Sequence, residues 1–439
     1  MQASRILQSI SLVTVVLMAG FSVAPQAQAQ AGQLDPTFGT GGIFGTTTGK
    51  SAANAVAIQT DGKIVVAGVG LTNSQPPNLA DTLFRLNTNG TLDTTFGTAG
   101  MANLVSPSNA QALGFCGEAI QSDGKIVAVA ETYNGLMVAR VETNGSLDTS
   151  FGSGGFTATL PVIVGGFTSF PSNMALQSDG KIVVVAGQLN PSVIARFDSD
   201  GQLDTTFGTA GVANLAFPNP TQVAVQSDGR ILVTSGADGA GAPVPSQQAG
   251  TIVRYKPNGA VDPTFGSAGI AACLPSASAL IVQPDGKIVV AGGTTSKLNA
   301  PPAASDTGFG LVRYNTNGTM DKTFGTKGVA ISDFGAAAPD SAGFALALQS
   351  NGDIVAAGTA GIITSGVFTS SFGLARYTSV GVLDPTFGTG GEVITPLGTG
   401  GASSVSAVAI QSDGKIVSAG TSVFHIEFSN AYVARYLSQ

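Results

Sequence analysis

Seven arginines and seven aspartates form the most conspicuous polar set in the sequence, because both recur at fixed places in a repeated motif. Charged residues repeated in this way could form a ring of binding sites, or they could form one structural ion pair per repeat. A residue that every copy needs is more simply explained by the fold, so we expect ion pairs. The arginines are Arg85, Arg140, Arg196, Arg254, Arg313, Arg376 and Arg435, and the aspartates are Asp35, Asp93, Asp148, Asp204, Asp262, Asp321 and Asp384.

One copy of this motif carries additional acidic residues. Asp198, Asp200 and Asp204 lie close together around Gly201, and spaced carboxylates beside a glycine turn can wrap a calcium ion. The run is short, lacks a distal glutamate and has no counterpart in the other copies, which favours a plain turn. We therefore expect no metal ion and no other cofactor, and these three aspartates are the weak candidate for a metal site.

The sequence does not display a catalytic constellation. His425 is the only histidine, and neither a His-Glu-x-x-His nor a Gly-x-Ser-x-Gly motif occurs, so the usual zinc sites and serine triads lack their partners. Paired carboxylates, as in glycosidases, need no histidine, but no pair stands out. We therefore assign no catalytic residue, and whether the protein catalyses a reaction stays open.

The charged residues are positioned by a short stretch of the type Gln-Ser-Asp-Gly-Lys-Ile-Val, which recurs seven times. Asp-Gly between two apolar runs predicts a hairpin with a type I′ turn. A third apolar run ending in arginine follows each hairpin, and then the motif Leu-Asp-x-Thr-Phe-Gly, so each repeat is predicted to hold four antiparallel strands. Units of this kind, repeated four to eight times, form β-propellers. The turns begin at Asp61, Asp123, Asp179, Asp228, Asp285, Asn351 and Asp413.

The two ends of the chain predict how the array closes. Residues 34–39 carry the last element of a repeat with nothing before it, and residues 434–437 carry the third strand of a repeat with nothing after it. Together they complete one blade, and a ring closed in this way has no exposed sheet edges. We therefore predict an all-β fold, a closed seven-bladed β-propeller with four antiparallel strands per blade. The N-terminal strand completes the C-terminal blade, and residues 30–439 form a single domain.

The combined motifs Gln-Ser-Asp-Gly-Lys-Ile-Val-Val-Ala-Gly, Leu-Ala-Arg-Tyr and Leu-Asp-x-Thr-Phe-Gly-x-x-Gly resemble the bacterial delta-60 repeat, a family that forms propellers. The resemblance covers residues 33–437. The fourth copy departs from it with Arg230 in place of lysine, and the sixth with Asn351-Gly352-Asp353 in place of Asp-Gly-Lys. The resemblance implies an exported or cell-surface bacterial protein, and it brings no established activity and no catalytic residue.

Residues 1–29 differ in composition from the repeats. Arg5 precedes an apolar run at residues 10–23, and Ala27-Gln28-Ala29 has the small-x-small form of a cleavage site. This pattern is typical of a secretory signal peptide cut before Gln30. We expect the mature protein to be secreted, periplasmic or at the cell surface, with the choice between periplasm and medium left open. Cys116 and Cys273 occupy different positions of different repeats, so we do not expect them to form a disulfide.

Because strands in a blade alternate in direction, the near-constant turns and Leu-Asp links share one face, here called the constant face. The remaining connections share the opposite, variable face, and loops on a rigid scaffold are where binding usually resides. We expect a binding or scaffold module that acts through the variable face on an unknown protein or glycan partner. The alternative is an extracytoplasmic lyase or hydrolase with carboxylates at the mouth of the central channel. The candidate binding residues are Asp81, Glu131, Asp238, Asp306 and Glu427.

The charge balance argues against two classes of partner. The net charge is −7, and most of the 19 lysines and arginines belong to the repeated motifs. Nucleic-acid affinity depends on phosphate contacts by basic residues, so we expect no nucleic-acid partner. No segment beyond residue 29 has the length and apolarity of a membrane span, so we expect no membrane insertion, and we expect a monomer.

Overall fold

The computed structural model consists of β-strands and turns. It describes residues 30–47, 51–71, 79–104, 112–132, 135–160, 173–187, 192–215, 217–236, 250–295, 307–334, 340–364, 367–397, 401–425 and 428–439. These ranges contain 27 strands and no helix, and therefore no helix that could cross a membrane. The proposed signal peptide, residues 1–29, lies outside them.

Four smaller sheets follow the chain in order, since antiparallel hairpins connect their consecutive strands. The first contains β2 (Ala52–Ile58), β3 (Ile64–Leu71), β4 (Leu79–Leu86) and β5 (Met101–Leu104), and the second β6 (Ala112–Ile120), β7 (Ile126–Thr132) and β8 (Gly135–Val141). The third contains β9 (Asn173–Leu176), β10 (Ile182–Ala186), β11 (Val193–Phe197) and β12 (Val212–Asn214), and the fourth β13 (Pro220–Val225), β14 (Ile231–Ser235), β15 (Gly250–Tyr255) and β16 (Ile270–Cys273).

The other twelve strands form three further antiparallel groups. Two single parallel pairs join these groups into one sheet, Thr307 with Asp340 and Ser370 with Ala402. The first two groups are β17 (Ser276–Val282), β18 (Ile288–Thr295), β19 (Thr307–Tyr314) and β20 (Val329–Ser332), and β21 (Asp340–Leu348), β22 (Ile354–Thr364), β23 (Val367–Tyr377) and β24 (Glu392–Thr395). The third, here called the last group, is β25 (Ala402–Ile410), β26 (Ile416–His425), β27 (Phe428–Tyr436) and β1 (Ile43–Gly45).

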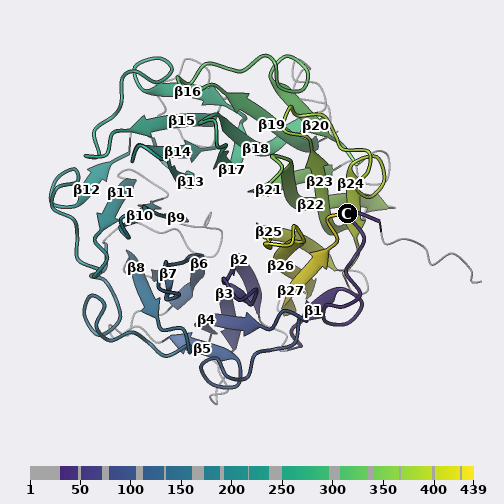
Figure 1. The fold of residues 1–439 in the computed structure, drawn as a ribbon, viewed down its shortest axis with the longest axis horizontal. Coiled ribbons are helices and arrows are strands. Elements are labelled where there is room, and N and C mark those ends of the chain that lie inside the picture. The colour runs from purple at the N-terminus through teal and green to yellow at the C-terminus, as the bar shows by residue number, and fades with distance from the viewer. Residues whose placement is uncertain are drawn as a thin grey trace, which may run out of the picture.

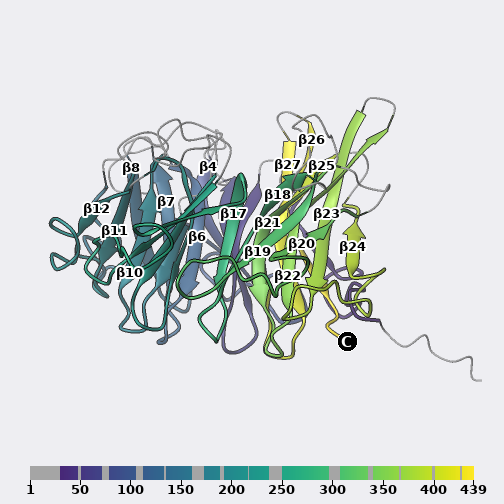
Figure 2. The ribbon, with the colours of Figure 1, turned by 90° about the horizontal axis from the view of Figure 1, so that it is seen from above.

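The sheets stand around a common axis, with β2, β6, β9, β13, β17, β21 and β25 nearest the centre (Figure 1). The strands β5, β12, β16, β20, β24 and β1 lie on the outside (Figure 1). Seen from the side, the strands run along this axis, and the C-terminus lies at one face (Figure 2). The prediction of an all-β, propeller-like fold is confirmed.

The sheets pack face to face because their middle strands are apolar on both sides. Val65 of β3 belongs to a buried cluster with Ile126 of the second sheet, whereas the next residue, Val66, packs with Val417 and Val433 of the last group. Since successive side chains of a strand point to opposite faces, one Ile-Val-Val-Ala run supplies two interfaces. Cys116 and Cys273 lie in different clusters and are not joined by a disulfide.

The Asp-Gly turn differs from the predicted type I′ turn. In the first copy Gly62 has a φ of 83°, but Asp61 is not among the residues with positive φ, as a type I′ turn would require. Gly62 N–H donates to Gln59 O at 2.9 Å and Gln59 N–H to Lys63 O at 2.8 Å, which is a three-residue hairpin loop ending in a glycine bulge. Asp61 Oδ1 accepts the Lys63 N–H at 3.0 Å, and this bond favours the observed form.

The second sheet also differs from the four strands predicted for each repeat. Between β8 and residue 160, where the described segment ends, the chain makes only isolated bridges, among them Leu136 with Leu160 and Ala139 with Phe156. Between them Val138 N–H donates to the Thr157 hydroxyl at 2.9 Å, where a regular ladder would offer a backbone carbonyl. The threonine side chain thus interrupts the outer strand of this sheet.

The first described strand pairs with the last. β1 runs antiparallel to β27, with Ile43 opposite Ala434, and Leu34 bridges Tyr436. The outer strand of the last group therefore comes from the other end of the described chain.

Candidate functional site

Each repeated arginine contacts the motif aspartate of the same sheet. The Nε–Oδ2 distances lie between 2.6 and 3.0 Å in all seven copies, including the pair Arg435–Asp35 that joins the two ends. The guanidinium also lies over the motif phenylalanine, 4.6 to 4.8 Å from the ring centroid, where cation–π attraction applies.

The third copy shows how completely these groups are used. Arg196 Nη1 donates to Pro257 O of the next repeat at 2.6 Å, and Asp204 Oδ1 accepts from the backbone and hydroxyl of Thr206. Burial alone would raise the pKa of Asp204, but the Thr206 hydrogen bonds and the Arg196 charge outweigh it and hold that pKa below its usual value. The arginines and aspartates thus tie each sheet internally and to its neighbour.

A second cation reaches the motif aspartate in six copies. The lysine after the Asp-Gly turn, or Arg230 in the fourth copy, places a nitrogen 2.7 to 3.8 Å from Oδ2 of that aspartate. In the sixth copy Asp353 occupies the lysine position. Asp384 is therefore paired with Arg376 alone among the ion pairs of the described residues.

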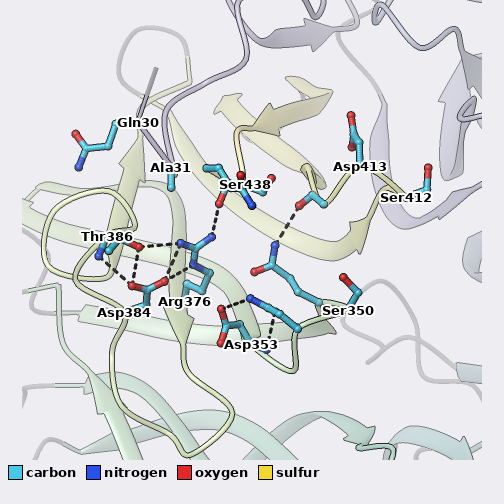
Figure 3. Close-up of a pocket in the computed structure, with 14 residues that line it drawn as sticks. Gln30, Ala31, Ser350, Asp353, Arg376, Asp384, Thr386, Ser412, Asp413 and Ser438 are labelled. Carbon is cyan, nitrogen blue, oxygen red and sulfur yellow. Dashed lines mark hydrogen bonds and ion pairs between the residues drawn. The ribbon is translucent and has the colours of Figure 1, made fainter. Parts of the chain in front are cut away.

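A cavity of about 820 Å³ opens beside Asp384, on the constant face (Figure 3). The sequence contained its signal, the Asn-Gly-Asp departure at residues 351–353, but gave no reason to expect a hollow there. Asp353, Asp384, Asp413 and Arg376 are among the residues that line it, and residues from both ends of the described chain contribute to its wall (Figure 3). The lining residues are Gln30, Ala31, Gln349, Ser350, Asn351, Asp353, Arg376, Asp384, Thr386, Ser412, Asp413, Gly414, Ser438 and Gln439.

Of the binding residues predicted on the variable face, only Asp81 has a described side chain, so a common site there stays a prediction. Asp81 lies in β4 and is 2% exposed, and its Oδ1 has no hydrogen-bond partner among the described residues. Burial raises its pKa to about 7, opposed by the Gly114 N–H. Glu131 lies in β7, but its side chain is not described. Asp238, Asp306 and Glu427 lie outside the described residues.

Glu118 of β6 is an unusual residue that sequence reasoning missed. Both of its carboxylate oxygens are buried without a hydrogen-bond partner among the described residues. Burial raises its pKa to about 8, and the nearby Ala57 N–H opposes the shift only in part. Aligning the seven copies on their glutamine would have exposed it, because the other six carry Val56, Met174, Val223, Leu280, Leu346 and Val408 at this position.

Two of the three aspartates of the weak metal candidate, Asp198 and Asp204, bind other partners through their carboxylates. Asp198 Oδ1 accepts the backbone N–H groups of Asp200 and Gln202 at 3.0 and 2.9 Å, and Asp204 is paired with Arg196. Within the described ranges, no group of three His, Cys, Asp or Glu side chains is placed to hold a metal ion.

Comparison with solved structures finds likeness across most of the chain at low sequence identity. Virginiamycin B lyase from Staphylococcus aureus has 14% identity and a TM-score of 0.47, covering 90% of this chain and 98% of that one. The polysaccharide lyase Uly1 has 12% identity and a TM-score of 0.45, covering 90% and 92%. A protein of unknown function from Dyadobacter fermentans has 11% identity and a TM-score of 0.44, covering 91% and 100%.

Comparison by sequence gives a more specific result. No curated protein matches the chain. The family model described as "Domain of unknown function (DUF5122) beta-propeller" matches residues 59–96, 121–151, 177–207, 226–265, 283–324 and 349–387. These segments cover about half of the chain and contain the hairpin and Arg–Asp motifs of six copies. The chain therefore belongs to the DUF5122 beta-propeller family, whose function is unknown.

Proposed function

We propose that this protein is an exported binding or scaffold module that acts through its variable face. The observation that carries the proposal is the contrast between the two faces. On the constant face the same loop recurs, with glycine N–H donating to glutamine O at 2.9 to 3.0 Å in each copy. The strands that lead to the variable face range from five residues in β10 and β11 to eleven in β22 and β23 (Figure 2). Such variation on a rigid scaffold is typical of a binding surface.

The scaffold we propose is a closed ring of seven blades, four-stranded except for the second, whose outer strand is interrupted, with β1 completing the last one. Seven motif copies support the number, and they also support the delta-60 designation. Contacts between the last group and the first sheet support closure. Arg435 Nη1 donates to Thr88 O, Gln411 Nε2 donates to Gly62 O at 3.2 Å, and Val433 packs in one cluster with Val66.

A test of the variable face shortens its longest described hairpin. Removing residues 362–369 and joining Gly361 to Ser370 through Asn-Gly keeps the register of the remaining β22–β23 pairs and supplies a suitable turn. Residues 30–439 should be screened on glycan and peptide arrays, and the shortened variant should bind the best ligand about tenfold or more weakly. Lys322→Ala, an exposed change in a constant-face link, is the matched control. Equal binding by the shortened variant, with loss in the control, would contradict the proposal.

Export is the second part of the proposal and has its own test. The apolar run and the Ala-Gln-Ala site support cleavage before Gln30. We expect N-terminal sequencing or intact mass of the natural protein to give a chain that begins at Gln30, recovered outside the cytoplasm. A cytoplasmic protein that retains residues 1–29 would contradict this part.

The alternative function is an extracytoplasmic lyase or hydrolase. The observation that favours it is the pair of carboxyl groups with raised pKa, Asp81 at about 7 and Glu118 at about 8. A carboxyl group that holds its proton near neutral pH is suited to general acid catalysis. The test is a substrate screen. If the protein turns over a substrate and the Glu118→Gln variant does not, the result would favour this alternative over a binding module.

A further inference from the structure

The cavity on the constant face lies where six other copies hold a positive charge of their own. In the fifth copy Lys287 Nζ lies 3.0 Å from Asp321 Oδ2, beside the Arg313 pair. In the sixth copy the same turn ends in Asp353, whose carboxylate accepts from Asn351 Nδ2 at 2.7 Å. In six copies the motif aspartate therefore binds the cation of this turn, and in the sixth copy that cation is missing.

The sixth copy retains the acceptors and opens them to solvent. The Asp384 side chain is 13% exposed, whereas its six equivalents are at most 8% exposed. Gln349 is 93% buried and lines the cavity, and its Oε1 has no hydrogen-bond partner in the described chain. The same oxygen is free in three copies that have the cation, so the missing cation, rather than this amide, distinguishes the sixth copy.

The charge and shape of the cavity favour an organic cation. Three carboxylates and one guanidinium line it, and its volume is about 820 Å³. Asp384 is paired with Arg376, and Asp413 lies 3.0 Å from Lys415 Nζ, so Asp353 is the lining carboxylate without an ion pair among the described residues. A metal ion would need several converging ligands, and no such group of three occurs in the described ranges. An alkylammonium group needs only hydrogen-bond acceptors and a carboxylate, which is what the lysine-bearing copies provide.

We propose that this cavity binds a primary alkylammonium group, the chemical group at the end of a lysine side chain, and that Asp384 is its carboxylate partner. The site lies on the constant face and does not depend on the function proposed for the variable face. The ammonium enters along the path that a lysine at residue 353 would take. Its source is a free alkylamine or a lysine side chain of another molecule.

The test uses butylammonium chloride, whose cation has the same four carbons and ammonium nitrogen as a lysine side chain. Isothermal titration of residues 30–439 should give one site, and Asp353→Lys should weaken binding about tenfold or more because its own ammonium then fills the cavity. The reverse change, Lys287→Asp, should add a second site and raise the stoichiometry from about one to about two. The melting temperature of each variant shows whether it is folded.

Three outcomes would overturn the proposal. In the first, the Asp353→Lys variant binds butylammonium as tightly as the parent protein. In the second, the parent protein does not bind butylammonium. In the third, the protein binds calcium and butylammonium does not compete with it. A peptide with one internal lysine distinguishes the sources: binding about tenfold tighter than butylammonium identifies a protein lysine, and equal binding identifies the free amine. Both results support the ammonium site.

The processed N-terminus is a further source of the same group, since Gln30 lines the cavity. A chain that begins at Gln30 carries an α-ammonium there, and cyclisation of this residue to pyroglutamate releases ammonia and removes the charge. Tighter butylammonium binding after cyclisation would identify the N-terminus as an internal competitor, whereas equal binding leaves the external amine as the ligand.

Discussion

Arg196→Ala is expected to lower the free energy of unfolding by about 3 to 5 kcal/mol, as when one partner of a buried ion pair is removed. The change leaves Asp204, whose side chain is 8% exposed, without the Nε–H that donates to Oδ2 at 2.9 Å. It also removes the guanidinium that lies 4.7 Å from the Phe207 centroid and the hydrogen bond to Pro257 O of the next repeat. Urea denaturation at pH 7 measures the effect.

Two variants separate this explanation from others. Lys256→Ala removes an exposed cation from the neighbouring link and should change the free energy of unfolding by less than about 0.5 kcal/mol. The double change Arg196→Met with Asp204→Leu leaves no unpaired charge and should recover part of the loss. Normal stability of Arg196→Ala together with loss of ligand binding would show that the arginines form a binding device instead.

Glu118→Leu is expected to raise the free energy of unfolding, and more so at higher pH. The pKa of Glu118 rises from 4.5 to about 8 on folding, and at 1.36 kcal/mol per unit the penalty for ionising it has an upper bound of about 5 kcal/mol at pH 8 and above. Leucine removes this penalty and supplies the apolar side chain that Leu280 and Leu346 provide in other copies. Thermal denaturation at pH 5 and pH 8 compares the variants, with Glu118→Gln as the uncharged polar control.

The sign of the pH dependence follows from the direction of each shift. Folding raises the pKa of Glu118 and of Asp81. Their contribution to the free energy of unfolding is therefore complete below about pH 4 and is lost as the pH rises to 7 and 8. The motif aspartates, with lowered pKa values such as about 2 for Asp262, contribute above their unfolded pKa and lose this contribution as the pH falls. We expect maximum stability at roughly pH 4 to 5. If the free energy of unfolding of Glu118→Leu still declined towards pH 8 as in the parent protein, Glu118 would not be the cause of that decline.

The sequence contained most of the information on the architecture, because its signals are local and repeated. Each Asp-Gly turn lies between two apolar runs, so the hairpins and their order could be predicted without knowledge of the packing. The type of turn could not, because it depends on whether Asp61 Oδ1 accepts the Lys63 N–H, a bond that competes with the type I′ geometry. The interrupted outer strand of the second sheet likewise depends on one hydroxyl, that of Thr157.

The sites were less predictable because they arise from departures between copies. The Asn-Gly-Asp turn at residues 351–353 was visible as a departure from the repeat, but the cavity appears only when neighbouring turns are placed beside Asp384. Glu118 lies in a strand whose local pattern is unremarkable, and only its position against the first sheet makes its carboxylate costly. The chemistry predicted for the variable face depends largely on loops outside the described residues.

The pairing of β1 with β27 has a consequence for how the chain folds. Ile43 and Ala434 must meet across almost the whole sequence, and although loop-closure entropy grows slowly with length, contacts of such separation form late. Since domains emerge from synthesis N-terminus first, β1 must wait for its partner until β27, the last described strand, has been made. From its synthesis until β1 has paired with it, β27 presents an unpaired edge, the kind of surface on which strands of separate molecules join. The first described strand is thus the last to find its partner, and it then covers the edge of β27 against aggregation.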